Sequence, residues 1–151
     1  MKKIYLDNAS SVPVLKENID IINNHLSCWH NPNGLYNDSI NNRSVIDMSR
    51  QGIIKYIGGN IDDRLIFTSS GSEANNMALD VLNYAIVYDP TSHSSVIDKC
   101  EYYHNKGFPV YPLSVLDTGA INLMDMYDKL CKAAWDKNNM EPRNVIISIC
   151  G

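Results

Sequence analysis

The chain has 151 residues, of which 44% are hydrophobic and 20% charged, and its formal net charge is -4. This length and composition are typical of one globular domain and exclude a disordered protein. Lysine and arginine are scattered along the sequence, and no apolar run is long enough for a signal peptide or a membrane span. We therefore expect a cytoplasmic protein that binds neither nucleic acid nor membranes.

In the first sixty residues the pattern predicts a short extended start at 4–6, a helix at 14–26, a loop at 28–34 and a second helix at about 38–57. The Gly58-Gly59 pair is expected to end the second helix. Five apolar residues at helical spacing are expected to supply its buried face: Val45, Ile46, Ile53, Ile54 and Ile57.

After residue 60, short apolar runs alternate with helical patterns. The sequence predicts strands at 65–67, 85–88, 110–113 and 145–149, a turn at 117–119, and helices at 73 to about 83, 93–106 and 122–136. This alternation predicts an α/β fold with three layers and a mostly parallel sheet.

The strongest local signal for chemistry is the Ser/Gly turn between a strand and a helix at residues 67–76. Such a turn exposes backbone N–H groups at the positive end of a helix, where they and the serine hydroxyls can hold a phosphate. It lacks the lysine of a P-loop, which disfavours a nucleoside triphosphate. The alternative is an ordinary N-cap, since Ser72 and Glu73 suit a first helical turn.

A second signal is His93, which follows a strand and lies near the start of a helix. A helix N-terminus disfavours a charged imidazolium, and a neutral ring can stack on a flat cofactor or move protons. The alternative is a histidine that only caps the helix or lies at the surface.

The cysteines are far apart and form no CxxC pair, so we expect free thiols. Cys100 with His104 and Cys28 with His30 are imperfectly spaced for a zinc site, and no metal is expected.

Five stretches in order along the chain resemble the class V aminotransferase group of enzymes that use pyridoxal phosphate (PLP), and most of all the cysteine desulfurases. They are Tyr5-Leu6-Asp7-Asn8-Ala9 with Pro13, Asn31-Pro32 with Leu35, the turn Phe67 to Asn76, His93 with Val96, Ile97 and Cys100, and the strand Val145 to Ile149. The resemblance implies fold type I, with an incomplete PLP-transferase large domain in residues 61–151. It implies that residues 1–60 belong to the small domain and the subunit interface.

The resemblance also implies site residues. Gly71 and Ser72 would bind the cofactor phosphate, and His93 would stack on the pyridine ring and act as the catalytic proton carrier. Asn8 and Ala9 would lie near the path of the substrate. The implied reaction takes sulfur from L-cysteine, leaves alanine and forms a persulfide on the enzyme, which would be a homodimer that passes sulfur to an acceptor protein.

The sequence departs from the family pattern at two places. The turn reads Ser-Ser-Gly-Ser where a threonine is usual at its end, although Ser72 keeps the hydroxyl, and Tyr36 stands where a histidine is usual. The Schiff-base lysine, the aspartate that pairs with the pyridine nitrogen and the sulfur-accepting cysteine are expected beyond residue 151. We therefore expect an N-terminal fragment that is inactive alone.

Two alternatives remain open at this point. The first is another class V enzyme, such as an aminotransferase, a selenocysteine lyase or a kynureninase-like hydrolase. The second is a non-catalytic domain that binds phosphate or another protein.

Overall fold

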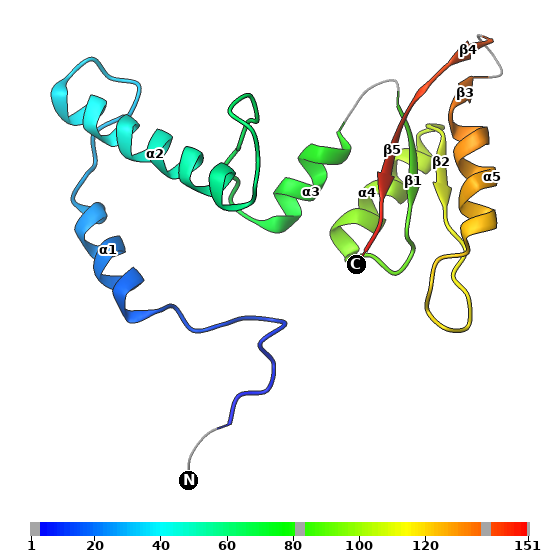
Figure 1. Ribbon diagram of the computed structural model, residues 1–151, viewed down its shortest axis with the longest axis horizontal. Coiled ribbons are helices and arrows are strands. Elements are labelled where there is room, and N and C mark those ends of the chain that lie inside the picture. The colour runs from blue at the N-terminus through cyan, green and yellow to red at the C-terminus, as the bar shows by residue number, and fades with distance from the viewer. Residues whose placement is uncertain (1–3, 81–83, 137–139, 151) are drawn as a thin grey trace. The chain divides into compact units, whose positions relative to one another are not determined.

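The chain divides into two compact units, Met1–Ile66 and Phe67–Gly151. The computed structural model describes residues 4–80, 84–136 and 140–150 (Figure 1). The assignment of the two parts to a small and a large domain stays a prediction.

The first unit holds two helices, α1 (Lys16–Leu26) and α2 (Asn37–Tyr56), as the apolar spacing predicts. The side-chain amide of Asn42 donates to the backbone oxygens of Cys28 and His30, which ties the loop between the helices to α2. Helix α2 ends where Gly58 takes a φ of 76°, which an L side chain rarely adopts, so the predicted stop at the glycine pair is confirmed. Residues 4–6 form no strand.

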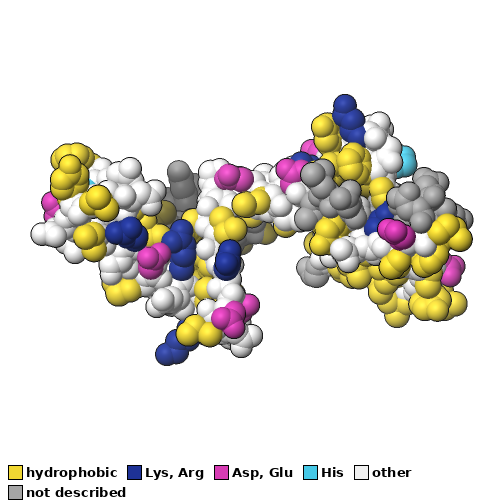
Figure 2. All heavy atoms as spheres, turned by 90° about the horizontal axis from the view of Figure 1, so that it is seen from above, with side chains coloured by type: hydrophobic (Ala, Val, Ile, Leu, Met, Phe, Trp, Pro, Cys, Tyr) yellow, Lys and Arg dark blue, Asp and Glu magenta, His cyan; other side chains and the backbone are white. Residues whose placement is uncertain are grey.

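The predicted buried face of α2 is wrong for this chain. Val45, Ile53 and Ile57 are exposed, Ile57 to 70%, and Ile46 and Ile54 are only half-buried. The reason is that no described helix or strand packs extensively against α2. Figure 2 shows hydrophobic side chains lying among charged ones on the visible surface.

The second unit is built on a three-stranded sheet in the order β2-β1-β5, with β1 (Tyr84–Tyr88), β2 (Val110–Pro112) and β5 (Asn144–Ser148) all parallel. Helices α3 (Gly71–Leu79) and α4 (Ser94–Asn105) contribute to the core on one face, and α5 (Leu123–Ala133) packs on the other (Figure 1). The predicted α/β architecture with three layers is confirmed.

Strand β1 lies between the other two strands and is buried on both faces. Ile86 and Tyr88 face the core with α4, whereas Ala85 and Val87 face the core with α5. This alternation is the two-residue period of a strand, and burial on both faces explains why the segment is a nearly continuous apolar run. Its β-branched and aromatic residues favour the extended backbone.

Two predicted elements differ from the structure. Residues 65–67 form no strand, because no described strand pairs with them, and Ile66 and Phe67 are 61% and 51% exposed. Helix α5 ends at Ala133 instead of residue 136, because Trp135–Asp136 (β3) pairs with Glu141–Pro142 (β4) in an antiparallel ladder. Helix α3 ends at Leu79, and the remainder of its predicted range includes 81–83, outside the described residues.

Within the described part of the chain, no helix combines the length and the apolar character needed to cross a membrane.

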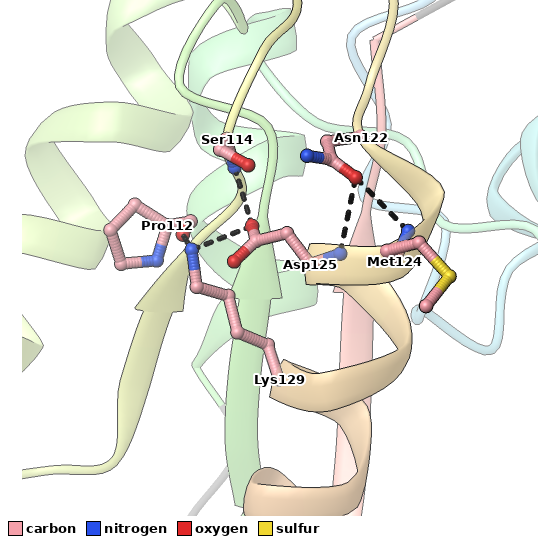
Figure 3. A network of polar contacts seen from close by, with 6 residues as sticks. All are labelled: Pro112, Ser114, Asn122, Met124, Asp125 and Lys129. Atoms are coloured by element: carbon pink, nitrogen blue, oxygen red, sulfur yellow. Dashed lines mark hydrogen bonds and ion pairs between the residues drawn. The ribbon is translucent and has the colours of Figure 1, made fainter.

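A network of polar contacts fixes the start of α5 against the end of β2 (Figure 3). The side-chain oxygen of Asn122 caps the helix by accepting from the N–H groups of Met124 and Asp125. The Asp125 carboxylate accepts from the Ser114 N–H and from Lys129, each at 2.7 Å, and Lys129 also donates to the Pro112 carbonyl. These contacts lower the pKa of Asp125 from 3.8 to about 2, with the Lys129 hydrogen bond as the largest cause.

This pKa predicts an acid-dependent loss of stability. Because the pKa of Asp125 is lower in the folded chain than in the unfolded one, its contribution is complete above about pH 4 and is lost as the pH falls towards 2. Chemical denaturation between pH 5 and pH 2 should show this loss, and Asp125→Asn should remove it. Asp128→Asn, an exposed position on the same helix, should leave it unchanged; equal behaviour of the two variants would contradict the prediction.

Candidate cofactor site at the carboxyl ends of the strands

The sheet places a ligand-binding edge at the carboxyl ends of β1 and β5. From β1 the chain passes through α4 to β2 on one side, and from β2 it passes through α5 to β5 on the other side of β1. The two connections use helices on opposite faces of the sheet. In parallel α/β sheets, such a reversal of strand order opens a crevice outside the carboxyl ends, where ligands bind.

Asp89, the first residue after β1, holds this edge together. Its side chain is buried and accepts from the Thr91 N–H at 2.8 Å and the Thr91 hydroxyl at 2.7 Å, and a longer contact of 3.4 Å joins it to the Cys150 N–H after β5. The Thr91 N–H is the main cause that lowers the pKa of this carboxyl below its usual value. A buried carboxylate with these partners stays ionised and joins the loops that leave the two strands.

The Ser/Gly turn forms the N-terminus of α3. Ser70 is the N-cap and accepts from the Glu73 N–H at 3.1 Å. The Glu73 carboxylate accepts from both the N–H and the hydroxyl of Ser69 at 2.6 Å, and these bonds lower its pKa. The turn is therefore an N-cap, and Ser72 and Glu73 lie in the first helical turn as the capping alternative predicts, although the capping residue itself is Ser70.

The donors that remain in this turn fit a phosphate group. The backbone N–H groups of Gly71 and Ser72 and the Ser72 hydroxyl donate no hydrogen bond within the described part of the chain. Both residues are exposed, and a Cβ atom added at Gly71 would meet nothing within 4 Å, so the turn is open to an incoming group. The positive end of α3 favours an anion at this place. The neighbouring Glu73 carboxylate is already bonded to Ser69.

His93 caps the next helix along the chain. Its Nδ1 atom accepts from the Ser95 N–H at 3.1 Å and lies 2.9 Å from the Ser95 hydroxyl oxygen. The Asn75 side-chain amide donates to the same hydroxyl oxygen at 2.9 Å, which connects α3 to α4. His93 itself is exposed. Capping thus occupies Nδ1, whereas Nε2 makes no hydrogen bond within the described part of the chain.

The structure brings three of the predicted site residues into one unit. Gly71 and Ser72 lie at the N-terminus of α3, and His93 lies at the N-terminus of α4, which packs against α3. Asn8 and Ala9 lie in the first unit, in an exposed turn whose Ser10 N–H donates to the Asp7 carbonyl. Their place beside the substrate stays a prediction, as do the cofactor roles of the other three.

Sequence reasoning missed Asn75, Ser95 and Asp89. The spacing Ser70-x-x-Glu73 is a local capping signal that could have identified the N-cap. The contact between Asn75 and Ser95 joins residues 20 positions apart, and no local pattern announces it.

All four cysteines are free, as expected, and only Cys100 is buried. Burial raises the pKa of the Cys100 thiol to about 11, so this sulfur is not a reactive thiolate at neutral pH. Among the described residues, no group of three His, Cys, Asp or Glu side chains is arranged to hold a metal ion.

Comparison with known proteins identifies the family to which this chain is related. A family model described as aminotransferase class-V matches residues 4–134. A cysteine desulfurase IscS from Dictyoglomus turgidum is 30% identical over 139 residues, covering 87% of this chain and 35% of the relative. A selenocysteine lyase from Xenopus laevis is 40% identical over 78 residues, covering 51% of this chain and 18% of the relative.

A solved structure of a NifS-like protein shares the fold, with a TM-score of 0.78 and 22% identity, covering 98% of this chain and 40% of that protein. The chain therefore spans little more than a third of the length of the IscS relative and of this structure. Since the family model covers most of the sequence and the predicted α/β fold is present, this chain belongs to the aminotransferase class-V family.

Proposed function

We propose that residues 1–151 form the N-terminal part of a PLP-dependent cysteine desulfurase. The observation that carries the proposal is the hydrogen bond from Asn75 on α3 to Ser95 beside His93, which joins α3 to the start of α4, in the unit where the Gly71 and Ser72 N–H groups at the N-terminus of α3 donate no bond among the described residues. An IscS from Dictyoglomus turgidum that aligns with 87% of the chain supports this choice. The whole enzyme would take sulfur from L-cysteine, leave alanine and transfer the sulfur as a persulfide to an acceptor protein.

The residues of this chain would each have a defined task. Gly71 and Ser72 would bind the phosphate of PLP through two N–H groups and one hydroxyl. His93 would pack against the pyridine ring and move a proton at its Nε2 atom, since Nδ1 is occupied by the helix cap. PLP, when bound, supplies an electron sink for the substrate's Cα. Asn8 and Ala9 would line the path of L-cysteine.

Selenocysteine lyase is a second candidate. The 40% identity to the Xenopus laevis protein covers about half of this chain and favours it. Assays with L-cysteine and L-selenocysteine on the longer protein would separate the two activities.

We also propose a homodimer in which the first unit contributes to the interface. Ile19, Ile22 and Leu26 on α1 and Ile53 on α2 are exposed in this chain, and exposed apolar faces promote association. A cytoplasmic location stays a prediction from the sequence.

The proposal predicts that residues 1–151 alone release no sulfide from L-cysteine above the background of free PLP. The turn and hydroxyls supply about 1–3 kcal/mol of binding, far below the roughly 8 kcal/mol that micromolar affinity requires. Borohydride reduction after mixing with PLP should therefore label no single lysine stoichiometrically. With an added thiol that reduces the persulfide to sulfide and is itself oxidised to a disulfide, the longer protein should release sulfide and alanine in equal amounts.

Two results would contradict this proposal. One is stoichiometric labelling of one lysine in residues 1–151 that disappears in Ser72→Ala or His93→Ala. The other is a longer protein that binds PLP but releases neither sulfide nor selenide from the two amino acids.

A further inference from the structure

We propose that Asn75 and Ser95 are positioning residues that fix the tautomer and the ring orientation of His93. The consequence for catalysis rests on the function proposed above, but the tautomer itself is a property of this chain. Asn75 lies on α3, and Ser95 and His93 lie at the start of α4, so the arrangement depends on the packing of two helices.

The chemistry of the three side chains determines which group donates and which accepts in each hydrogen bond. The Asn75 amide nitrogen can only donate hydrogen bonds, so the Ser95 hydroxyl oxygen accepts from it at 2.9 Å. The hydroxyl hydrogen is then free to point to Nδ1 of His93, which lies 2.9 Å away. The Ser95 N–H donates to the same atom at 3.1 Å. Two donors therefore converge on Nδ1.

An Nδ1 atom that accepts hydrogen bonds cannot carry a proton. If the ring proton moved to Nδ1, it would point at the Ser95 N–H, which would lose its acceptor, and the Ser95 hydroxyl could no longer donate to the ring. The neutral ring consequently keeps its proton on Nε2. Burial strengthens this preference, because Ser95 is only 8% exposed and Asn75 is half-buried, so water competes poorly for their bonds.

The helix pair has a second attachment that does not involve His93. At the other end of α3, the Tyr103 hydroxyl donates to the Asp80 carboxylate, and Lys99 lies 3.5 Å from the same carboxylate. Leu79 is buried in the core that α4 shares. Removal of the Asn75 or Ser95 contact should therefore leave the helices packed, and its effect on the His93 ring can be measured in a folded chain.

For the proposed reaction, this arrangement presents an N–H at Nε2 to a ligand. The neutral ring would act on a ligand as a hydrogen-bond donor at Nε2. A proton transferred from Nε2 would come from the doubly protonated ring, in which the Nδ1–H points to the Ser95 oxygen. Asn75 and Ser95 would touch neither cofactor nor substrate in this scheme.

The test determines which tautomer of His93 is present in the ¹⁵N-labelled chain without cofactor. NMR at alkaline pH identifies the tautomer from the chemical shifts and couplings of the ring nitrogens. We expect mainly the Nε2–H form. Ser95→Ala should lower the ratio of Nε2–H to Nδ1–H about fivefold, as the loss of one hydrogen bond does. Ser95→Thr, which keeps the hydroxyl, should show the same tautomer ratio as the unmodified chain. Asn75→Ala should change the ratio in the same direction as Ser95→Ala while leaving the buried Ser95 in place.

Asn76→Ala is the matched control, because Asn76 is also a half-buried amide on α3 but, among the described residues, its side chain donates to the Ser72 carbonyl of its own helix and not to α4. It should leave the His93 ratio unchanged. A main Nδ1–H form in the unmodified chain would overturn the proposal, as would an equal response of Asn76→Ala, or no response of a folded Ser95→Ala. A longer protein without desulfurase activity would leave these spectra unaffected, so the two proposals can fail separately.

Discussion

Asp89→Asn is expected to lower the free energy of unfolding by about 1.5–3 kcal/mol, the size of a hydrogen bond to a charged group. The Asp89 carboxylate accepts from two groups of Thr91 and from the Cys150 N–H, and it has almost no exposure to water. An asparagine has one acceptor oxygen, so its NH₂ group would face a donor from one of these partners. The loss should appear in urea denaturation at pH 7.

The effect should depend on pH in a definite direction. Hydrogen bonds from Thr91 hold the pKa of Asp89 below its usual value of 3.8, so its stabilisation is complete above that value and is lost as the pH falls through the folded pKa. The difference between the parent chain and Asp89→Asn should therefore shrink in acid. Asp98→Asn, an exposed aspartate of α4, should stay within about 0.5 kcal/mol of the parent at every pH. If Asp89→Asn left the free energy of unfolding unchanged at pH 7, the carboxylate would not stabilise the loops that follow β1 and β5.

Local patterns predict much of this fold because they act within a few residues. The stop of α2 depends on the positive φ of Gly58, and the N-terminus of α5 depends on the side chain of Asn122, both visible in the sequence. Strand β1 was predictable because a strand buried on both faces must be apolar along its length.

The incorrect predictions concern what a segment packs against, which local patterns do not contain. Residues 65–67 have the composition of a buried strand, but pairing requires a neighbour that the described chain does not provide. The apolar face of α2 was predicted for the same reason and is exposed here. In the candidate site, the Ser/Gly turn and His93 were visible as motifs, whereas the bond from Asn75 to Ser95 exists only because α3 packs against α4.

In the longer protein proposed above, His93→Ala is expected to lower the turnover of L-cysteine by about 10²–10⁴-fold, the contribution typical of a positioned general acid or base. The physical reason is that His93 presents an exposed imidazole at the carboxyl edge of the sheet, with Nδ1 bonded to Ser95 and Nε2 left to exchange a proton. Steady-state measurement of sulfide release with saturating PLP and an added thiol reductant would give the loss.

A second substitution separates proton transfer from stacking. His93→Phe keeps a flat ring that can pack on the pyridine ring but carries no proton, so PLP should bind nearly as well as before while turnover stays as low as in His93→Ala. His104→Ala, an exposed histidine near the end of the same helix, should leave both quantities unchanged. If His93→Phe restored turnover, the ring would act by packing alone. If His93→Ala stayed within tenfold of the parent, His93 would be a helix cap without a catalytic task.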